Sequence, residues 1–347
     1  MIYGLFMFFV MIVFLYKITI REDKREIAFS SIQSNANSLR GLFAIMIILS
    51  HSTMAFESVP TLLVPFAKIS TICVGYFFVA SGYGLAWSNS NKKGYLSNNF
   101  LMKKILYLVC LAVLAYIYLL LIQIINYYFF DGKNIQVSIS AWWKSTNWYL
   151  KMQGLMYILY FCVNRCIRNK KKACWLLGVI LLSICMTCCI TKMVGRSYYI
   201  SELCFWFGIV LYEYGDWIKK CFDKYMKYVM LLIGILCMIS LGAFVVKKIT
   251  IADCVFHNLL CISACFVMII FLYYFKIGNV FLSFFNKISL ELYICQFGLF
   301  DLYKAIFRTL QIKPNFGYVF FVLVSDILIA LLAMNVNKIV SNRINKL

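Results

Sequence analysis

The residues best suited to chemistry are a cation and an imidazole at the two ends of one apolar run. Residues 38–52 read SLRGLFAIMIILSHS, which places Arg40 and His51 eleven residues apart. At about 100° per helical residue, both lie on one face, about 16 Å apart along the axis. A guanidinium binds phosphate through paired hydrogen bonds, and histidine suits general-base work at neutral pH. The pair suits a substrate with an anionic head and a reactive tail. An interfacial arginine and a packed core histidine are the alternatives.

The elements that must position these residues are membrane helices. The 347-residue chain is 63% hydrophobic and 14% charged, whereas soluble domains are near 45–50% apolar and about 25% charged. Its continuous apolar runs of about 18 residues or more predict spanning helices rather than barrel strands. We expect an all-α polytopic membrane protein with about eleven transmembrane helices. The predicted spans are 2–18, 40–58, 66–87, 105–130, 146–163, 173–191, 199–216, 228–246, 253–275, 288–307 and 316–336.

The distribution of positive charge predicts the orientation. Of the 34 Lys and Arg residues, 23 lie in alternate loops and the tail, within 17–40, 92–104, 165–172, 219–227, 276–287 and 338–346. Such loops face the cytoplasm, so the N-terminus is expected outside and the C-terminus inside. This bias explains much of the net charge of +21, and we expect no nucleic-acid partner. The first span lacks a basic n-region and a cleavage site, which favours a retained anchor over a signal peptide.

Other polar residues in or near the spans are possible partners of His51. Membrane carboxylates usually face a bundle interior or a cavity, and the choice among them stays open. The candidates are Glu57, Glu202, Glu291, Asp301 and Asp326.

The second histidine and the cysteines have simpler expected roles. We expect His257 to pack or to make a local hydrogen bond. The CxxC pair of Cys185 and Cys188 lies in an apolar run without polar partners, so helix packing is expected and no metal is predicted.

A set of motifs resembles the acyltransferase 3 family. Arg, ten residues, then His at the start of a span is the family's signature, and YFFVASGYGLAWS at 76–88 resembles its F-F-x-x-S-G segment. Weaker matches follow in the family's order, at 100–108, 148–150, 207–208 and 286–296. The resemblance covers about 38–336. It implies a family core of about ten helices, to which this chain adds one N-terminal helix. The expected organisation is an extra helix (1–20), a cytoplasmic loop (21–37), a membrane acyltransferase domain (38–336) and a cytoplasmic tail (337–347).

The resemblance implies transfer of an acyl group, most often acetyl, from cytoplasmic acyl-CoA to a hydroxyl. The implied acceptor is a carbohydrate, commonly a lipid-linked or surface glycan, which suggests a bacterial inner-membrane O-acetyltransferase. His51 would be the general base or carry a covalent acyl group, and acetyl-CoA would be a co-substrate. The residues expected to hold the donor are Arg40, Lys103, Lys104 and Ser81. The residues expected to touch the acceptor are Trp148, Glu202 and Trp143.

The sequence departs from the family pattern at three places. Many members have Arg-x-x-Arg where this chain has Lys103, Lys104 and then Tyr107; Lys lacks the planar fork. A branch of the family has Glu where this chain has Gln153. The late segment often ends in His, and here it ends in Gln296. A second catalytic histidine is therefore not expected at that place.

Two other functional classes suit a polytopic protein. A transporter or flippase of a lipid-linked glycan would also use many spans and an intramembrane histidine, but such proteins often have paired repeats with interrupted helices, which this sequence lacks. A non-catalytic subunit of a glycan assembly system is the second alternative.

Overall fold

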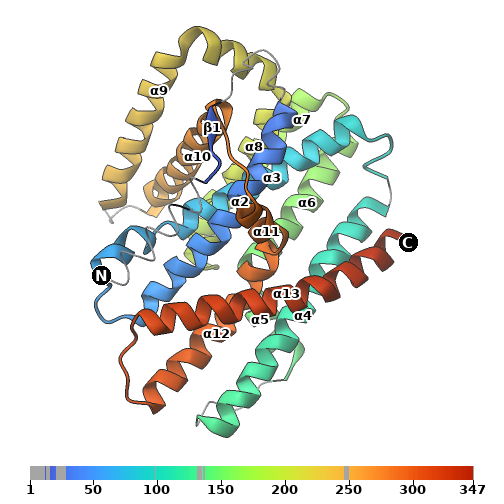
Figure 1. The fold of residues 1–347 in the computed structure, drawn as a ribbon. Helices are drawn as coiled ribbons and strands as arrows, with labels where there is room; N and C mark the ends of the chain where they lie inside the picture. The colour runs from blue at the N-terminus through green and yellow to red at the C-terminus, as the bar shows by residue number, and fades with distance from the viewer. Residues whose placement is uncertain are drawn as a thin grey trace.

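A computed structural model describes residue 12 and residues 16–20, 29–97, 99–130, 135, 137–245 and 250–346 as a bundle of long helices (Figure 1). Its main helices are α2 (Phe29–Ser52), α3 (Ser70–Asn91), α4 (Asn99–Phe129), α6 (Trp148–Cys166), α7 (Lys170–Thr191), α8 (Leu203–Glu213), α9 (Gly215–Val245), α10 (Thr250–Tyr274), α12 (Ser289–Thr309) and α13 (Phe316–Lys346). Shorter elements are η1 (Thr53–Ala55), η2 (Thr61–Phe66), α5 (Ile139–Ser145), η3 (Arg196–Tyr198) and α11 (Val280–Lys287). Two residues of β1 (Thr19–Ile20) pair antiparallel with β2 (Phe275–Lys276).

The all-α membrane fold predicted from the sequence is confirmed. Ten of the predicted spans fall on the main helices, and five stretches are long and apolar enough to cross a bilayer by themselves: 61–91, 99–129, 170–191, 251–274 and 316–344. The other main helices carry charged residues or are shorter; α8, for example, has 11 residues. The first predicted span, 2–18, lies almost wholly outside the described residues. The total of eleven spans therefore stays a prediction.

Helix α2 holds both candidate residues and crosses the middle of the molecule (Figure 1). It begins at Phe29, within the segment expected to be a loop, so Arg40 lies in its interior and His51 in its last turn. Its apolar side chains, such as Ile47, Ile48 and Leu49, are fully buried. Helices α3, α11 and α12 pack against α2 and supply the surroundings of the site.

Glycines allow the closest helix contacts. A Cβ added at Gly82 of α3 would lie 2.0 Å from the carbonyl oxygen of Phe205, and one at Gly208 of α8 would lie 2.2 Å from that of Val79. The α3 and α8 backbones therefore touch, which only residues without a side chain permit. Gly84, two residues further along α3 and therefore on its opposite side, would carry a Cβ with no atom of the described residues within 4 Å, so it is not part of this contact.

Three of the basic connections meet at one end of the bundle. Lys170 at the start of α7 donates a hydrogen bond to Ser90 at the end of α3, at 2.9 Å. Lys171 lies over the ring of Tyr214, just after α8, at 5.4 Å from its centroid. His51 lies in the last turn of α2, eleven residues after Arg40, and Trp148 begins α6, whose last turn carries Arg165.

Candidate active site

The imidazole of His51 is held by α12. Its Nδ1 lies 3.1 Å from Oε1 of Gln296. The rings of Phe297 and Phe300 lie beside it, with centroids 5.0 and 6.1 Å away. The side chain of His51 is half-buried. The histidine therefore sits in a largely apolar setting, where one amide fixes its orientation.

The hydrogen bonds of Gln296 define which nitrogen of His51 carries the proton. Gln296 is fully buried, and its Nε2 donates to the carbonyl oxygen of Tyr293 at 2.9 Å. A carbonyl accepts only, so the amide nitrogen must face Tyr293 and the amide oxygen must face His51. Nδ1 of His51 is then the donor, and Nε2 of the neutral ring holds the lone pair. This tautomer leaves Nε2 able to accept a proton from a substrate hydroxyl.

Arg40 lies against an aromatic cluster formed by α3 and α6. Its guanidinium carbon is 5.7 Å from the ring centroid of Phe77 in α3. The ring of Tyr149 in α6 packs against Phe77 in turn, with centroids 6.3 Å apart. The Nε atom is buried and has no hydrogen-bond partner among the described residues. A partly buried arginine with an unused donor suits an anionic ligand.

The other expected donor-binding residues divide into two groups. Lys104 lies over the ring of Tyr157 at 5.6 Å, and Ser81 is half-buried in α3. Arg40 lies over Phe77 of α3, so Arg40 and Lys104 both contact the aromatic side chains of α3 and α6. Lys103 precedes Lys104 in α4 and is half-buried; its contact with a donor stays a prediction.

An aromatic cluster joins the Arg40 region to the His51 region. Tyr293 of α12 packs against Phe77, with centroids 6.3 Å apart, and against Tyr149, at 5.3 Å. Tyr293 is also the residue whose carbonyl fixes Gln296. Side chains of α3, α6 and α12 therefore form one connected set of contacts from Arg40 to His51.

The carboxylates considered as partners of His51 have other surroundings. Glu291 accepts a hydrogen bond from Asn337 at 2.8 Å. Glu202 is fully buried and accepts from the backbone nitrogen of Ser201 at 2.9 Å. Glu57 lies 3.4 Å from Lys313 at the surface. Asp326 is fully buried and has no hydrogen-bond partner among the described residues. His51 instead forms a hydrogen bond with Gln296. The sequence did not predict this partner, because position 296 stands out in the sequence only as a place where many family members have a histidine.

One acceptor candidate lines a cavity that includes Phe297, a ring neighbour of His51. The cavity has a volume of about 150 Å³ and lies between α4, the α5–α6 connection and α12. Trp148 and Phe297 line it, as does Tyr118, whose hydroxyl is buried without a hydrogen-bond partner among the described residues. Trp143 lines a neighbouring groove instead. The fully buried Glu202 lines neither hollow, and its role with an acceptor stays a prediction.

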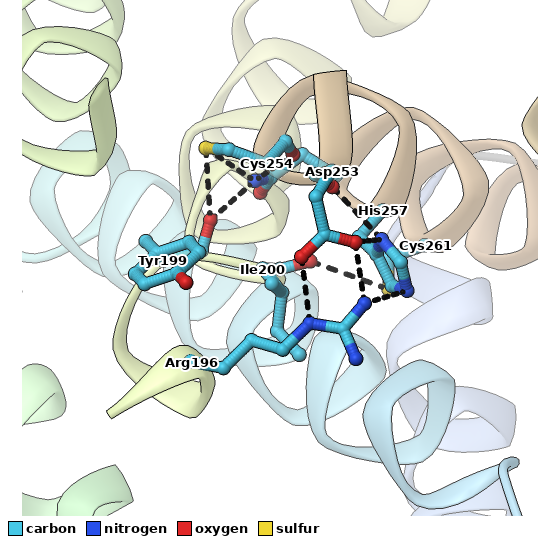
Figure 2. Close-up of polar contacts among 8 residues, drawn as sticks. Arg196, Tyr199, Ile200, Asp253, Cys254, His257 and Cys261 are labelled. Atoms are coloured by element: carbon cyan, nitrogen blue, oxygen red, sulfur yellow. Dashed lines mark hydrogen bonds and ion pairs between the residues drawn. The ribbon is translucent and has the colours of Figure 1, made fainter. Parts of the chain in front are cut away.

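The second histidine belongs to a separate polar cluster between η3 and α10 (Figure 2). Nδ1 of His257 is 2.8 Å from the backbone oxygen of Asp253, which confirms the expected local hydrogen bond. Arg196 pairs with the Asp253 carboxylate through both Nε and a terminal nitrogen, and it lies 3.0 Å from Nε2 of His257. Each ring nitrogen therefore has a partner, and the cluster ties the loop before α8 to the start of α10.

Comparison with known proteins assigns a family to this arrangement. The family model for an acyltransferase domain, acyltransferase 3, matches residues 33–334. This range begins on α2 before Arg40 and includes Gln296 of α12. No curated protein and no solved structure matches the chain.

Proposed function

Because the chain belongs to the acyltransferase 3 family, we propose that it is a membrane O-acetyltransferase that moves the acetyl group of acetyl-CoA to a hydroxyl of a carbohydrate acceptor, a lipid-linked glycan. The observation that carries the proposal is the pairing of His51 with Gln296. A neutral imidazole with its proton held on Nδ1 presents Nε2 as a base, in a site lined by Phe297 and Phe300.

The donor would bind through its phosphates at the basic end. Arg40 offers a planar set of donors, of which Nε is unused within the described structure, and Lys104 adds a point charge. Lys103 and Ser81 complete the proposed donor contacts. The shared face of Arg40 and His51 would guide the extended pantetheine arm toward the imidazole. Bound in this way, the thioester is held at a fixed distance from the base, which lowers the entropic cost of the reaction.

The chemical step would then be a single acyl transfer. The acceptor oxygen attacks the thioester carbonyl while Nε2 of His51 takes the hydroxyl proton. The tetrahedral intermediate collapses, the carbon–sulfur bond breaks, and the imidazolium returns the proton to the leaving thiolate. The products are an O-acetyl ester and free coenzyme A. A route through an acetyl-histidine intermediate would use the same nitrogen, because Nδ1 is engaged by Gln296.

The proposed orientation places the donor end in the cytoplasm. The basic connections meet at that end, and basic loops remain on the cytoplasmic side of the bacterial inner membrane. The C-terminus would lie inside and the N-terminus outside. Donor and acceptor would therefore approach His51 from opposite ends, the acceptor past Trp148, with Trp143 and Glu202 as further acceptor candidates.

Acetyl transfer by the purified protein tests this function. Nanodiscs containing the protein are incubated with acetyl-labelled acetyl-CoA, with and without a membrane glycolipid extract. We expect label to move into the glycolipid fraction and free coenzyme A to form in equal amount. A transporter or an assembly subunit would produce neither, and absence of both products would overturn the proposal.

A further inference from the structure

An open groove lies on the outer surface of the bundle between α4 and α6, closed at one end by α5. Its volume is about 290 Å³. Val109 of α4 and Ile158 of α6 line it and are 40% and 41% exposed. Gly154 leaves space in its floor, where an added Cβ would be 3.7 Å from Ile105 and Leu108. Because α4 is apolar and long enough to cross a bilayer, these exposed side chains face hydrocarbon, and the groove is open to the lipid phase.

One lysine lines this largely apolar groove. Lys151 lies one turn into α6 and lines the groove together with Trp142 and Trp143. Its Nζ is 4.7 Å from the ring centroid of Trp143, and no carboxylate of the described residues forms an ion pair with it. The Nε1 of Trp142 is buried without a hydrogen-bond partner among the described residues. A cation at a lipid-facing site is costly unless an anion accompanies it, and the phosphate of a lipid is an anion that the membrane itself supplies.

The groove is long enough to hold the first part of a lipid chain and runs along the helices. Lys151 and Ile158 are seven residues apart, so the groove follows α6 for about 10 Å. It runs from the α5 end, where Trp142 and Trp143 lie, toward the middle of the bundle. A lipid with its phosphate at Lys151 would lay its chain along this apolar length.

The groove adjoins the cavity that includes Phe297. Ala112 of α4 and Thr146, just before α6, line both hollows. The inner cavity reaches Phe297, whose ring centroid is 5.0 Å from that of His51. A substituent carried on the phosphate could therefore extend from the lipid-facing groove past Thr146 to the imidazole. The two hollows together extend from the lipid-facing groove to Phe297, a ring neighbour of His51.

We propose that the α4–α6 groove binds the hydrocarbon chain of a phosphate-linked lipid, that Lys151 binds its phosphate, and that the hydroxyl acylated by the enzyme is carried on this lipid. The assignment of the lipid as acceptor rests on the proposed function, whereas the binding of a lipid phosphate does not. The acceptor would reach His51 sideways from the membrane, while acetyl-CoA approaches from the basic end.

Photolabelling tests the groove directly. The full-length protein in phosphatidylcholine nanodiscs is exposed to a polyprenyl monophosphate with a diazirine in its chain, and labelled peptides are mapped by mass spectrometry. A neutral polyprenol of the same chain is the control for the phosphate. The variants are Lys151→Glu, which reverses the charge, and Gly154→Leu, which fills the floor. Lys144→Glu is the matched control, because Lys144 is an exposed residue of α5 that does not line the groove.

We expect label on α4 and α6 that is at least fivefold stronger for the monophosphate than for the polyprenol. Lys151→Glu should remove this preference, and Gly154→Leu should reduce the label, whereas Lys144→Glu should change neither. If Gly154→Leu does not fold, Lys151→Glu and the polyprenol control still decide. Equal labelling by both probes, unaffected by Lys151→Glu, would show an ordinary annular lipid and overturn the proposal, as would label that maps elsewhere.

Two further variants separate this proposal from the proposed function. His51→Ala should retain the label, since lipid binding does not need the base. Lys151→Glu should raise the KM for lipid acceptor severalfold and leave acetyl-CoA binding unchanged. If labelling behaves as expected but no acetyl transfer occurs, the lipid site stands and the acyltransferase function fails. If transfer occurs but the groove is not labelled, the function stands and the proposed lipid site fails.

Discussion

Replacement of Gln296 tests how the fold prepares His51. In Gln296→Met, methionine has nearly the same volume as glutamine, so the substitution leaves no cavity. It provides no acceptor for Nδ1 of His51 and no donor to the carbonyl of Tyr293. A hydrogen bond between neutral groups contributes about 0.5–1.5 kcal/mol. If the transition state loses that amount, kcat falls by about 2- to 12-fold. The KM for acetyl-CoA should not change, because the hydrogen bonds of Gln296 go to His51 and Tyr293 and not to the residues proposed to bind the donor.

Gln296→Glu supplies the control for this experiment. A carboxylate oxygen can still accept the hydrogen bond from Nδ1 of His51 at the 3.1 Å position of the amide oxygen, so the reactive tautomer is retained. We expect this variant to recover most of the kcat that Gln296→Met loses. Steady-state acetyl transfer in nanodiscs gives both constants. A Gln296→Met variant with normal kcat, a change confined to KM, or a Glu variant no better than Met would refute the reasoning.

Three further predictions follow from the packing and charge of the described residues. Arg40→Ala should weaken acetyl-CoA binding by about 10- to 150-fold, the equivalent of about 1.5–3 kcal/mol for charge-assisted hydrogen bonds, as measured by calorimetry; unchanged affinity would remove Arg40 from the donor site. Gly208→Ala should lower stability by about 1–3 kcal/mol or prevent folding, because its Cβ would meet the α3 backbone at 2.2 Å, whereas Gly84→Ala should be neutral in the same thermal unfolding assay. Equal midpoints for the two would contradict the α3–α8 contact. Arg196→Ala should cost less than about 1 kcal/mol, since the arginine is 51% exposed, and should leave acetyl transfer near normal; a large loss of transfer would show that the Asp253 cluster takes part in catalysis.

The helices could be predicted because continuous apolar runs have one stable form in a bilayer. The runs around Arg40 and His51, and at 173–191 and 316–336, fall on α2, α7 and α13. The ends were less predictable: α2 begins at Phe29, because a helix can extend into polar residues once its backbone bonds are formed.

The details of the site depended on contacts between distant parts of the chain. His51 and Gln296 are 245 residues apart, and no local pattern indicates that they touch. A glutamine in an apolar helix also gives no sign of its amide orientation, which here is set by the carbonyl of Tyr293. Similarly, the groove above Gly154 forms only where α4, α5 and α6 meet. The sequence around Lys151 does not show that this lysine lines a groove.

The central claim is that Nε2 of His51 is the base for acyl transfer, and His51→Ala tests it most directly. The variant and the wild-type protein, matched for expression and for thermal stability, are compared for acetyl transfer from labelled acetyl-CoA to the glycolipid extract, with acetyl-CoA affinity measured on the same samples. The account predicts that transfer is abolished while acetyl-CoA still binds with near wild-type affinity. Transfer at the wild-type rate by His51→Ala would contradict it.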